Sequence, residues 1–252
     1  MNRPRIIPVL LLQNGGLVKS IQFKNHQYIG DPINAVKLFN DLKADELVLL
    51  DIDATKEGRS ISLDLVKQIG EEANMPFSVG GGIKDIATIQ QLIQAGAERV
   101  IINTAAFEQP NFIKEASSMF GTSTISVCID YKRTLFRKEF ATIKGGTTNS
   151  SYSLMEAVAF AANQGAGEII VQSIEKDGTM SGFDSSTLQK INDSVSIPVV
   201  ALGGGGSKSD FESLYQATPL NGIAAGSYFV FQGKLRGVLI QYPPVSNYTF
   251  AQ

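Results

Sequence analysis

Short apolar segments alternating with amphipathic ones predict an α/β protein whose eight β/α units form a (β/α)8 barrel. Eight such apolar segments are spread over 252 residues. Each is apolar at nearly every position, as expected of parallel strands that are buried on both faces. The length is typical of one such barrel, the TIM barrel, in which right-handed crossovers join the units. A doubly wound open sheet is the alternative architecture with the same alternation.

The expected elements follow from this pattern in chain order. The apolar runs predict the strands Arg5–Leu11, Glu46–Asp51, Phe77–Val79, Arg99–Ile102, Thr124–Asp130, Glu168–Gln172, Val199–Leu202 and Gly222–Ala225. Between them, apolar residues spaced three and four apart indicate helices. The clearest of these are Asp31–Leu42, Leu63–Glu72, Ile86–Gln94, Asn111–Met119, Leu154–Asn163 and Ser209–Gln216.

The second half of the chain repeats the first at an offset of about 122 residues. The segment Met75–Phe77 matches Ile197–Val199, and each precedes a run of glycines. Likewise, Glu46–Leu50 matches Glu168–Gln172. A repeat of this length predicts two equivalent sets of loops at the carboxyl rim of the barrel.

The repeat divides the chain into half-barrels of roughly residues 1–122 and 123–252. No linker rich in proline, glycine or serine separates the two halves. We therefore expect residues 1–252 to form a single barrel domain.

Composition narrows the class of protein. The net charge of −2 argues against general nucleic-acid binding and against a basic membrane-binding face. One cysteine, Cys128 in an apolar run, excludes an intrachain disulfide and is expected to be buried.

One histidine, His26, is expected to be a solvated loop residue and cannot build a multi-histidine metal site. We expect no metal and no cofactor. Without an 18-residue apolar segment or a signal peptide, we expect a cytoplasmic protein.

Two glycine runs, Gly80–Gly82 and Gly203–Gly206, each follow a strand and precede a helix. Glycine lets backbone N–H groups approach a phosphate closely, and a helix N-terminus favours an anion. After the next strand of each half comes a polar pair, Asn103-Thr104 or Gly226-Ser227. These features predict two phosphate cradles that hold a ligand with a phosphate at each end. Glycines also occur in such turns for geometric reasons alone.

Several motifs resemble those of a known family over nearly the whole chain, to about Phe231. They are Ile6–Pro8, Gln22–Asn25, Gly30–Pro32, Ala44–Leu47, Val79–Ile83, Ile102–Ala106 and Asp177–Thr179. In this order they resemble the cyclase subunit of imidazole glycerol phosphate synthase, the HisF family. The resemblance implies a HisH-like glutaminase subunit at the N-terminal face of the barrel, with ammonia passing through the barrel. At the top, ammonia would meet a bis-phosphorylated substrate and yield imidazole glycerol phosphate and an aminoimidazole carboxamide ribotide.

The resemblance also implies which residues bind the phosphates. For one end they are Gly82, Asn103 and Thr104. For the other end they are Asp177, Gly178, Gly204, Gly226 and Ser227. Lys19 matches a lysine in the mobile loop after the first strand.

Of the family's two catalytic aspartates, one is matched and one is replaced. Asp130, at the end of the fifth strand, matches the first, and a carboxylate there can act as a general base. A structural role in helix capping or ion pairing is the alternative for Asp130. Leu11 stands in the place of the second aspartate, and losing a general acid or base commonly costs roughly 10²–10⁴ in rate. Asp51 is an acid that could substitute.

Two further positions at the same rim also depart from the family. Gln172 replaces a threonine that ends strand six, and Leu202 replaces a serine that ends strand seven. Leucine at positions 11 and 202 adds apolar bulk beside the expected substrate path.

The base of the barrel keeps the family's charges. Arg5, Glu46, Arg99 and Glu168 lie at strand starts and match the salt-bridged ammonia gate, with Arg99 in place of a lysine. Buried charges require partners, so a purely structural plug is the alternative. Glu98 matches an acid that contacts the glutaminase.

The segment Gly237–Pro244 departs from the usual cyclase ending and resembles a divergent, WbuZ-like branch associated with glycosyl amidation. That branch implies a third partner, an adenylating sugar amidotransferase that converts an acetamido into an acetamidino group for surface polysaccharide or glycan. The sequence therefore favours an ammonia conduit. An active cyclase of histidine biosynthesis and a barrel isomerase of the same pathway are the alternatives.

Overall fold

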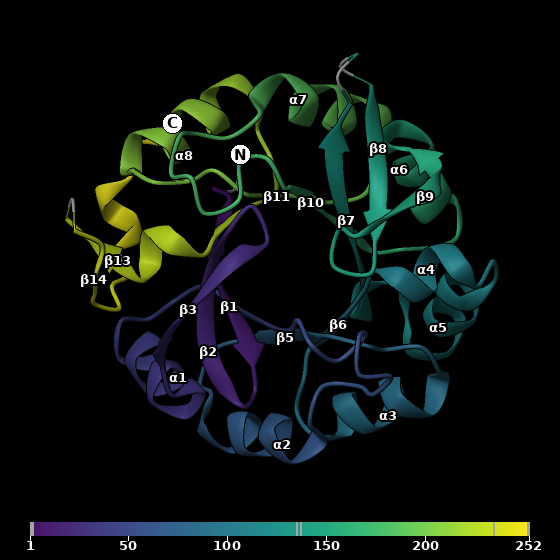
Figure 1. Cartoon of the computed structure of the whole chain (residues 1–252), viewed down its shortest axis with the longest axis horizontal. Helices are drawn as coiled ribbons and strands as arrows, with labels where there is room; N and C mark the ends of the chain where they lie inside the picture. Colours follow the sequence, from purple (N-terminus) through teal and green to yellow (C-terminus); the bar gives the residue numbers. More distant parts are fainter. Residues whose placement is uncertain (1–2, 135, 137, 234, 251–252) are drawn as a thin grey trace.

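Eight parallel strands form a closed barrel (Figure 1). The structure is a computed structural model that describes residues 3–250 with the exception of 135, 137 and 234. In spatial order the strands are β1 (Arg5–Gln13), β4 (Leu47–Asp51), β5 (Phe77–Gly80), β6 (Arg99–Ile102), β7 (Ile125–Arg133), β10 (Glu168–Ser173), β11 (Val199–Leu202) and β12 (Gly222–Ala225). The barrel closes because β12 pairs in parallel with β1. The expected barrel is confirmed, and the open sheet is excluded.

Helices surround the barrel, and most begin at a residue whose side chain accepts a backbone N–H group. They are α1 (Pro32–Asp41), α2 (Leu63–Glu72), α3 (Ile86–Gln94), α4 (Thr104–Glu108), α5 (Phe112–Phe120), α6 (Leu154–Asn163), α7 (Ser185–Ser194) and α8 (Lys208–Ala217). Asp85 caps α3 and Ser207 caps α8. The sequence pattern missed α7 because it buries only Thr187, Leu188 and Ile191 and is otherwise polar.

Each half of the barrel carries an antiparallel hairpin after its first strand. The hairpin β2–β3 (Gly16–Ile21 and Lys24–Gly30) follows β1, and β8–β9 (Glu139–Ile143 and Thr148–Ser153) follows β7. Since β1 and β7 lie on opposite sides of the closed barrel, the two hairpins project from opposite sides of its mouth (Figure 1). The segment that forms β2–β3 was expected to be a loop after the first strand, and that expectation is wrong, because Lys19 lies in strand β2.

The remaining elements are short. They are the 3₁₀ helices η1 (Thr122–Thr124), η2 (Ser227–Phe229) and η3 (Val245–Asn247) and the hairpin strands β13 (Phe231–Gln232) and β14 (Gly237–Val238). The C-terminal segment is fastened to the barrel by Tyr242, whose ring stacks on Phe229 and whose hydroxyl donates to the Ile6 carbonyl at 3.1 Å.

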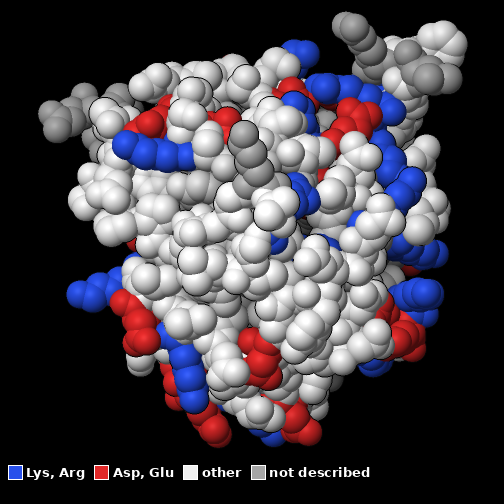
Figure 2. All heavy atoms as spheres, turned by 60° about the vertical axis from the view of Figure 1, so that its left-hand side comes forward, with Lys and Arg blue, Asp and Glu red and all other residues white. Residues whose placement is uncertain are grey.

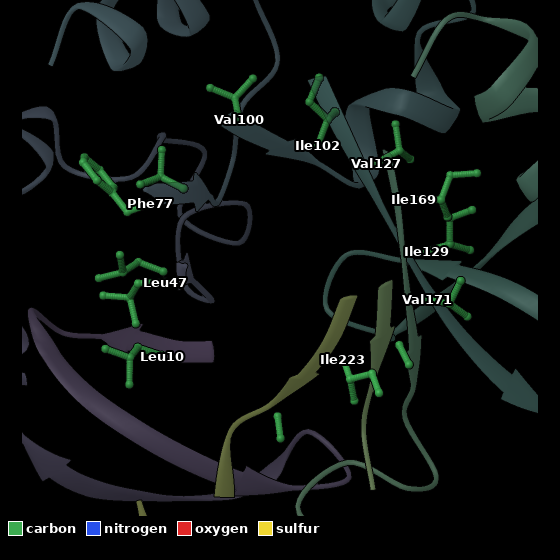
Figure 3. Packing of buried hydrophobic residues seen from close by; sticks show 14 of the residues in the cluster. Leu10, Leu47, Phe77, Val100, Ile102, Val127, Ile129, Ile169, Val171 and Ile223 are labelled. Atoms are coloured by element: carbon green, nitrogen blue, oxygen red, sulfur yellow. The ribbon is translucent and has the colours of Figure 1, made fainter. Parts of the chain in front are cut away.

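The strand residues alternate between two apolar layers. One side of each strand packs against the helices, where Leu10, Leu47 and Ile169 lie in a continuous layer (Figure 3). The other side fills the barrel interior, where Ile7 and Val9 belong to a separate cluster. This arrangement explains why the strands are apolar at nearly every position.

Acidic and basic side chains are interspersed on the side of the molecule shown in Figure 2. Cys128 is buried, as expected, and His26 is exposed, although it lies in β3 and not in a loop. Among the residues that the structure describes, no helix has both the length and the apolar character needed to cross a membrane.

Candidate functional site

Six of the expected phosphate-site residues border a single pocket at the carboxyl rim. We call this group the second cradle, and it consists of Lys19, Asp177, Gly178, Gly204, Gly226 and Ser227. The residues come from β2, from the loops after β10 and β11, and from the junction of β12 with η2. The fold thus gathers residues from opposite ends of the chain at one place.

Close backbone approaches explain the glycines of the second cradle. At Gly178, with φ of +68°, a Cβ atom would lie 2.0 Å from the Ser20 carbonyl oxygen. At Gly204, with φ of +112°, it would lie 2.2 Å from the Gly182 oxygen. At Gly226 it would meet the Lys19 ammonium group. A larger residue at any of these positions would displace the backbone or the lysine.

Lys19 supplies the positive charge of the second cradle. Its side chain is buried, and its ammonium group donates to the Val9 carbonyl. Burial lowers the pKa of Lys19 to about 8, against the opposing charge of Asp177. The Asp177 carboxylate accepts hydrogen bonds from the Ser20 hydroxyl at 3.1 Å and from Gln172 at 3.5 Å. Burial raises the pKa of Asp177, although the nearby Lys19 charge opposes this.

The start of helix α8 contributes less to this cradle than its position suggests. The N–H groups of Gly206 and Ser207 donate to the Asp210 carboxylate at 2.9 and 2.8 Å. Since these helix-end donors are used within the helix itself, the buried cation and the glycine loops are what this pocket offers to an anion.

The other expected phosphate residues, Gly82, Asn103 and Thr104, lie on the opposite side of the rim, at β5 and β6; we call them the first cradle. The Thr104 hydroxyl accepts the Lys144 N–H at 3.0 Å and donates to Asn103 Oδ1 at 3.3 Å. At Gly82, with φ of +63°, a Cβ atom would lie 1.8 Å from the Arg59 oxygen. The turn geometry alone therefore requires this glycine.

Asp130 is buried at the carboxyl end of β7. Asn103 Nδ2 donates to Asp130 Oδ2 at 3.2 Å, and the Cys128 thiol lies 3.5 Å from Asp130 Oδ1. Burial raises the pKa of Asp130 to about 7, and the Asp177 charge adds to the increase while the two hydrogen bonds oppose it. Neither hydrogen-bond partner is charged, which argues against the ion-pair alternative. A carboxyl group with this pKa can accept or donate a proton near neutral pH.

Leu11 lies on the interior face of β1, opposite Val18 of β2 and Leu50 of β4. It belongs to the interior apolar cluster, as does Leu202. We call Leu11, Val18, Leu50 and Leu202 the apolar cap, because they cover the top of the barrel interior. Leu11 thus packs on hydrocarbon in the barrel interior, and it also borders the pocket of the second cradle.

Asp51, the acid that was expected as a possible substitute, is bound within the loop after β4. Its neighbour Leu50 packs in the barrel interior, so Asp51 faces the other side of β4. Its carboxylate pairs with Arg59 at 2.5 Å and accepts the Ala54 N–H at 3.1 Å. These contacts hold the loop after β4 in place.

Gln172 lies between two acids of the rim, Asp177 and Asp130. Its side chain is buried and reaches Asp177 through Nε2, while its Oε1 lies 4.0 Å from the Cys128 sulfur. A continuous polar path thus runs from Asp177 through Gln172 and Cys128 to Asp130.

At the base, a chain of ion pairs joins the four expected charges. Arg5 pairs with both Glu46 and Glu168, and Arg99 pairs with Glu46 at 3.3 Å. Ser78 donates to Glu46 at 2.9 Å. These bonds compensate the two buried carboxylates, as buried charges require. Glu98 is exposed and pairs with Arg99 at 3.3 Å.

Above these charges, the barrel axis contains a small enclosed cavity of about 10 Å³. Glu46 and Glu168 border it below. Higher up, its walls are apolar and include Val48, Ile170 and Leu202. A volume of this size is close to that of a single water-sized molecule.

The family model described as "Histidine biosynthesis protein" matches residues 5–236. The chain belongs to this family. A relative from Leptospira interrogans, provisionally named imidazole glycerol phosphate synthase subunit HisF, is 42% identical over 244 residues and covers 96% of each chain. The imidazole glycerol phosphate synthase subunit HisF of Streptococcus sanguinis is 36% identical over 229 residues, which is 91% of each chain. The chain is thus a HisF-family synthase subunit.

For this HisF-family chain, the sequence pointed to residues that the structure gathers at the rim and at the base of the barrel, but it missed residues that act through β2. Val18 covers Leu11, and Ser20 holds Asp177. The residues Leu17–Ser20 are all buried, and the polar Lys19 and Ser20 among them leave no apolar run and no alternation that would mark a strand. Arg59 and Lys144 were also missed, because their contacts depend on loops whose conformation no local pattern specifies.

Proposed function

We propose that this HisF-family chain conducts ammonia from a HisH-like glutaminase, bound at its N-terminal face, to an acceptor outside its own rim. In this proposal the chain is the synthase subunit of a glutamine amidotransferase complex in the cytoplasm. The nitrogen of the delivered ammonia is used to form an acetamidino sugar in surface polysaccharide or glycan biosynthesis. An adenylating sugar amidotransferase is the third partner.

The observation that carries the proposal is Leu11 within the apolar cap. Closing an imidazole ring requires proton transfers at several atoms, and a leucine can neither accept nor donate a proton. Leu202 and Leu50 lie with Leu11 in the interior apolar cluster. Leu11 also borders the pocket of the second cradle, so hydrocarbon stands at the place where a second carboxylate would act.

The base of the barrel supports the conduit part of the proposal. Arg5, Glu46, Arg99 and Glu168 form linked ion pairs at one end of the axial cavity. Apolar walls above them favour neutral ammonia over ammonium, because an unpaired charge is costly to desolvate. The hollow at the N-terminal face, which Arg3, Arg5 and Arg99 border, is the expected docking place of the glutaminase.

Asp130 favours the second candidate, an active cyclase subunit of histidine biosynthesis. Its pKa of about 7 and its contact with Asn103 suit a general acid or base. The candidate requires that Asp130 alone, or with Asp177, perform every proton transfer.

A cyclase assay separates the two candidates. The purified chain is given the bis-phosphorylated cyclase substrate and a high concentration of ammonium salt, so that no glutaminase is needed. We expect turnover at least about 10²-fold below that of an S. sanguinis HisF control, because one acid is missing. The variant Leu11→Asp should increase the turnover, and the matched variant Leu11→Asn should not. Turnover equal to the control would refute the conduit proposal.

A further inference from the structure

We propose that the side chain of Leu202 is an apolar upper gate, which ammonia passes when it leaves the axial cavity for the pocket of the second cradle. Leu202 lies at the end of this cavity that is opposite to Glu46 and Glu168. The inference rests on the proposed function, because a gate at this place matters only if ammonia travels along the barrel axis.

The axial cavity and the pocket of the second cradle share a wall. Of the residues that the structure describes, Val9 and Leu202 alone border both hollows. On the far side of this wall, the pocket is bordered by the polar side chains of Gln172 and Asp177. A molecule that crosses between Val9 and Leu202 therefore leaves the barrel axis and enters the rim pocket directly.

Leu202 is the part of this wall that can move. Val9 is β-branched, so its side chain is stiff at χ1, and its carbonyl is held by the Lys19 ammonium group. Leu202 has two rotatable side-chain bonds, ends strand β11 and is followed by Gly203. Its neighbour in register on β12 is Ala224, whose methyl group occupies little space. Since interior side chains do exchange rotamers, Leu202 can uncover an opening without a change of fold.

A hydrogen-bonding group stands beside the gate on the next strand. Gln172 of β10 is in register with Leu202. Its Nε2 donates to Asp177 at 3.5 Å, while its Oε1 lies 4.0 Å from the sulfur of Cys128, which is a weak donor. The amide oxygen can therefore accept an N–H of an ammonia molecule that has passed Leu202.

The wall favours ammonia over ammonium. An ammonium ion would lose its hydration between the hydrocarbon side chains of Val9 and Leu202, and an unpaired charge is costly to desolvate. Ammonia is neutral and crosses at a smaller cost. Since Gln172 and Asp177 offer acceptors beyond the wall, the crossing leads from an apolar to a polar space.

The alternative exit from the axial cavity would run past Cys128. This residue also borders the cavity, and its thiol lies 3.5 Å from Asp130 Oδ1. Asp130, however, is buried and borders neither of the two hollows. Packed side chains thus lie behind Cys128, whereas a pocket lies behind Leu202.

Substitutions at position 202 test the upper gate in the complete amidation system. The readout is the fraction of product nitrogen that comes from amide-labelled glutamine in the presence of excess unlabelled ammonium. Leu202→Phe adds bulk to the wall and should lower this fraction at least threefold. Leu202→Met keeps the volume and the flexibility of the side chain, so it should retain the fraction.

The matched control is Leu188→Phe in helix α7. Leu188 is 4% exposed and Leu202 is 5% exposed, but Leu188 packs in the layer between strands and helices, away from the barrel axis. Leu188→Phe should leave the labelled fraction unchanged. Thermal unfolding of each variant verifies that it is folded.

A second measurement decides the matter if Leu202→Phe does not fold. Crystals of Leu202→Ala under xenon pressure should hold xenon at the place of the removed side chain, in one hollow that joins the axial cavity to the rim pocket. Leu188→Ala should show no xenon on the barrel axis. Two hollows that stay separate in Leu202→Ala would overturn the proposal.

The wild-type result distinguishes the upper gate from the proposed function. If wild type itself incorporates no more label than the unlabelled ammonium predicts, the chain conducts no ammonia and both proposals are wrong. If wild type gives a high labelled fraction, and folded Leu202→Phe gives the same fraction as Leu188→Phe, the conduit stands. Ammonia then leaves the barrel without passing Leu202, and the upper gate alone is overturned.

Discussion

At the level of single residues, Asp130 is an acid at the end of a barrel strand, and its pKa is close to neutrality. Its burial is what raises the pKa to about 7, from an ordinary value of 3.8. The same burial links Asp130 to the stability of the fold, because the folded and the unfolded chain then bind protons differently.

The raised pKa of Asp130 should make the stability of the fold depend on pH. Between about pH 4 and pH 7 the folded chain keeps a proton on Asp130 that the unfolded chain releases, so the contribution of Asp130 to stability falls as the pH rises. Asp130→Asn resembles the protonated form and does not titrate. At pH 8 this variant should exceed the wild type in free energy of unfolding by on the order of 2 kcal/mol. Near pH 4 the two should be equal.

Urea unfolding of both proteins at pH 4 and pH 8 measures the difference. A variant that is less stable than the wild type at pH 8 would mean that the Asp130 carboxylate is stabilised by partners in its charged form. In that case the ion-pair hypothesis for Asp130 would be reinstated.

At the level of secondary-structure elements, the sequence predicted the strands far better than the hairpins. The eight barrel strands were found because both of their faces are buried, which leaves a continuous apolar run such as Ile6–Leu12. Strand β3, with the sequence KNHQYIG, has almost no buried residue and forms because β2 pairs with it. Such a strand depends on a partner and has no pattern of its own.

The hairpin β2–β3 also positions the second cradle, and Gly178 is the point where the two meet. The Gln22 N–H donates to the Asp177 carbonyl at 3.0 Å, and Gly178 lies against Ser20. A side chain at Gly178 should therefore separate the hairpin from the loop after β10.

We predict that Gly178→Ala lowers the free energy of unfolding by about 2–4 kcal/mol, because it combines a positive φ with a backbone clash. Gly15→Ala is the matched control, since Gly15 has φ of +77° but no atom within 4 Å of the added Cβ. The control should cost about 1 kcal/mol from backbone strain alone. Chemical unfolding measures both, and equal losses would show that the contact with Ser20 is not important.

At the level of the whole molecule, the arrangement of side chains at the base of the barrel could be predicted from the sequence, whereas that at the top could not. The basal charges lie at the starts of regular strands, so their meeting follows from the barrel topology. The top depends on hairpins and loops, and its side-chain contacts could not be predicted. They join segments far apart in the sequence, such as Lys144 and Thr104.

The base also links the two half-barrels, because Arg5 of the first half bonds to Glu168 of the second. Glu46 holds Arg5 and Arg99 at once, so it is the central residue of this group. If ammonia enters the axial cavity here, Glu46 controls both the shape of the opening and the charge that a passing molecule meets.

We predict that Glu46→Ala reduces the transfer of glutamine nitrogen through the barrel in the complete amidation system. The measurement is the fraction of product nitrogen that comes from amide-labelled glutamine in the presence of excess unlabelled ammonium. Wild type should give a high labelled fraction, and Glu46→Ala a fraction at least threefold lower, because Arg5 and Arg99 then lose the carboxylate that joins them, while Arg5 keeps Glu168 and Arg99 keeps Glu98. Removing one partner of a buried pair also costs about 3–5 kcal/mol, so the folded state is verified first.

The matched control is Lys37→Met, which removes an ion pair with Glu72 between the outer helices α1 and α2, where the Lys37 side chain is 54% exposed. It should leave the labelled fraction unchanged and cost at most about 1 kcal/mol. If Glu46→Ala folds and its labelled fraction equals that of Lys37→Met, the basal charges are a structural plug. Ammonia would then reach the acceptor by a path outside the barrel axis.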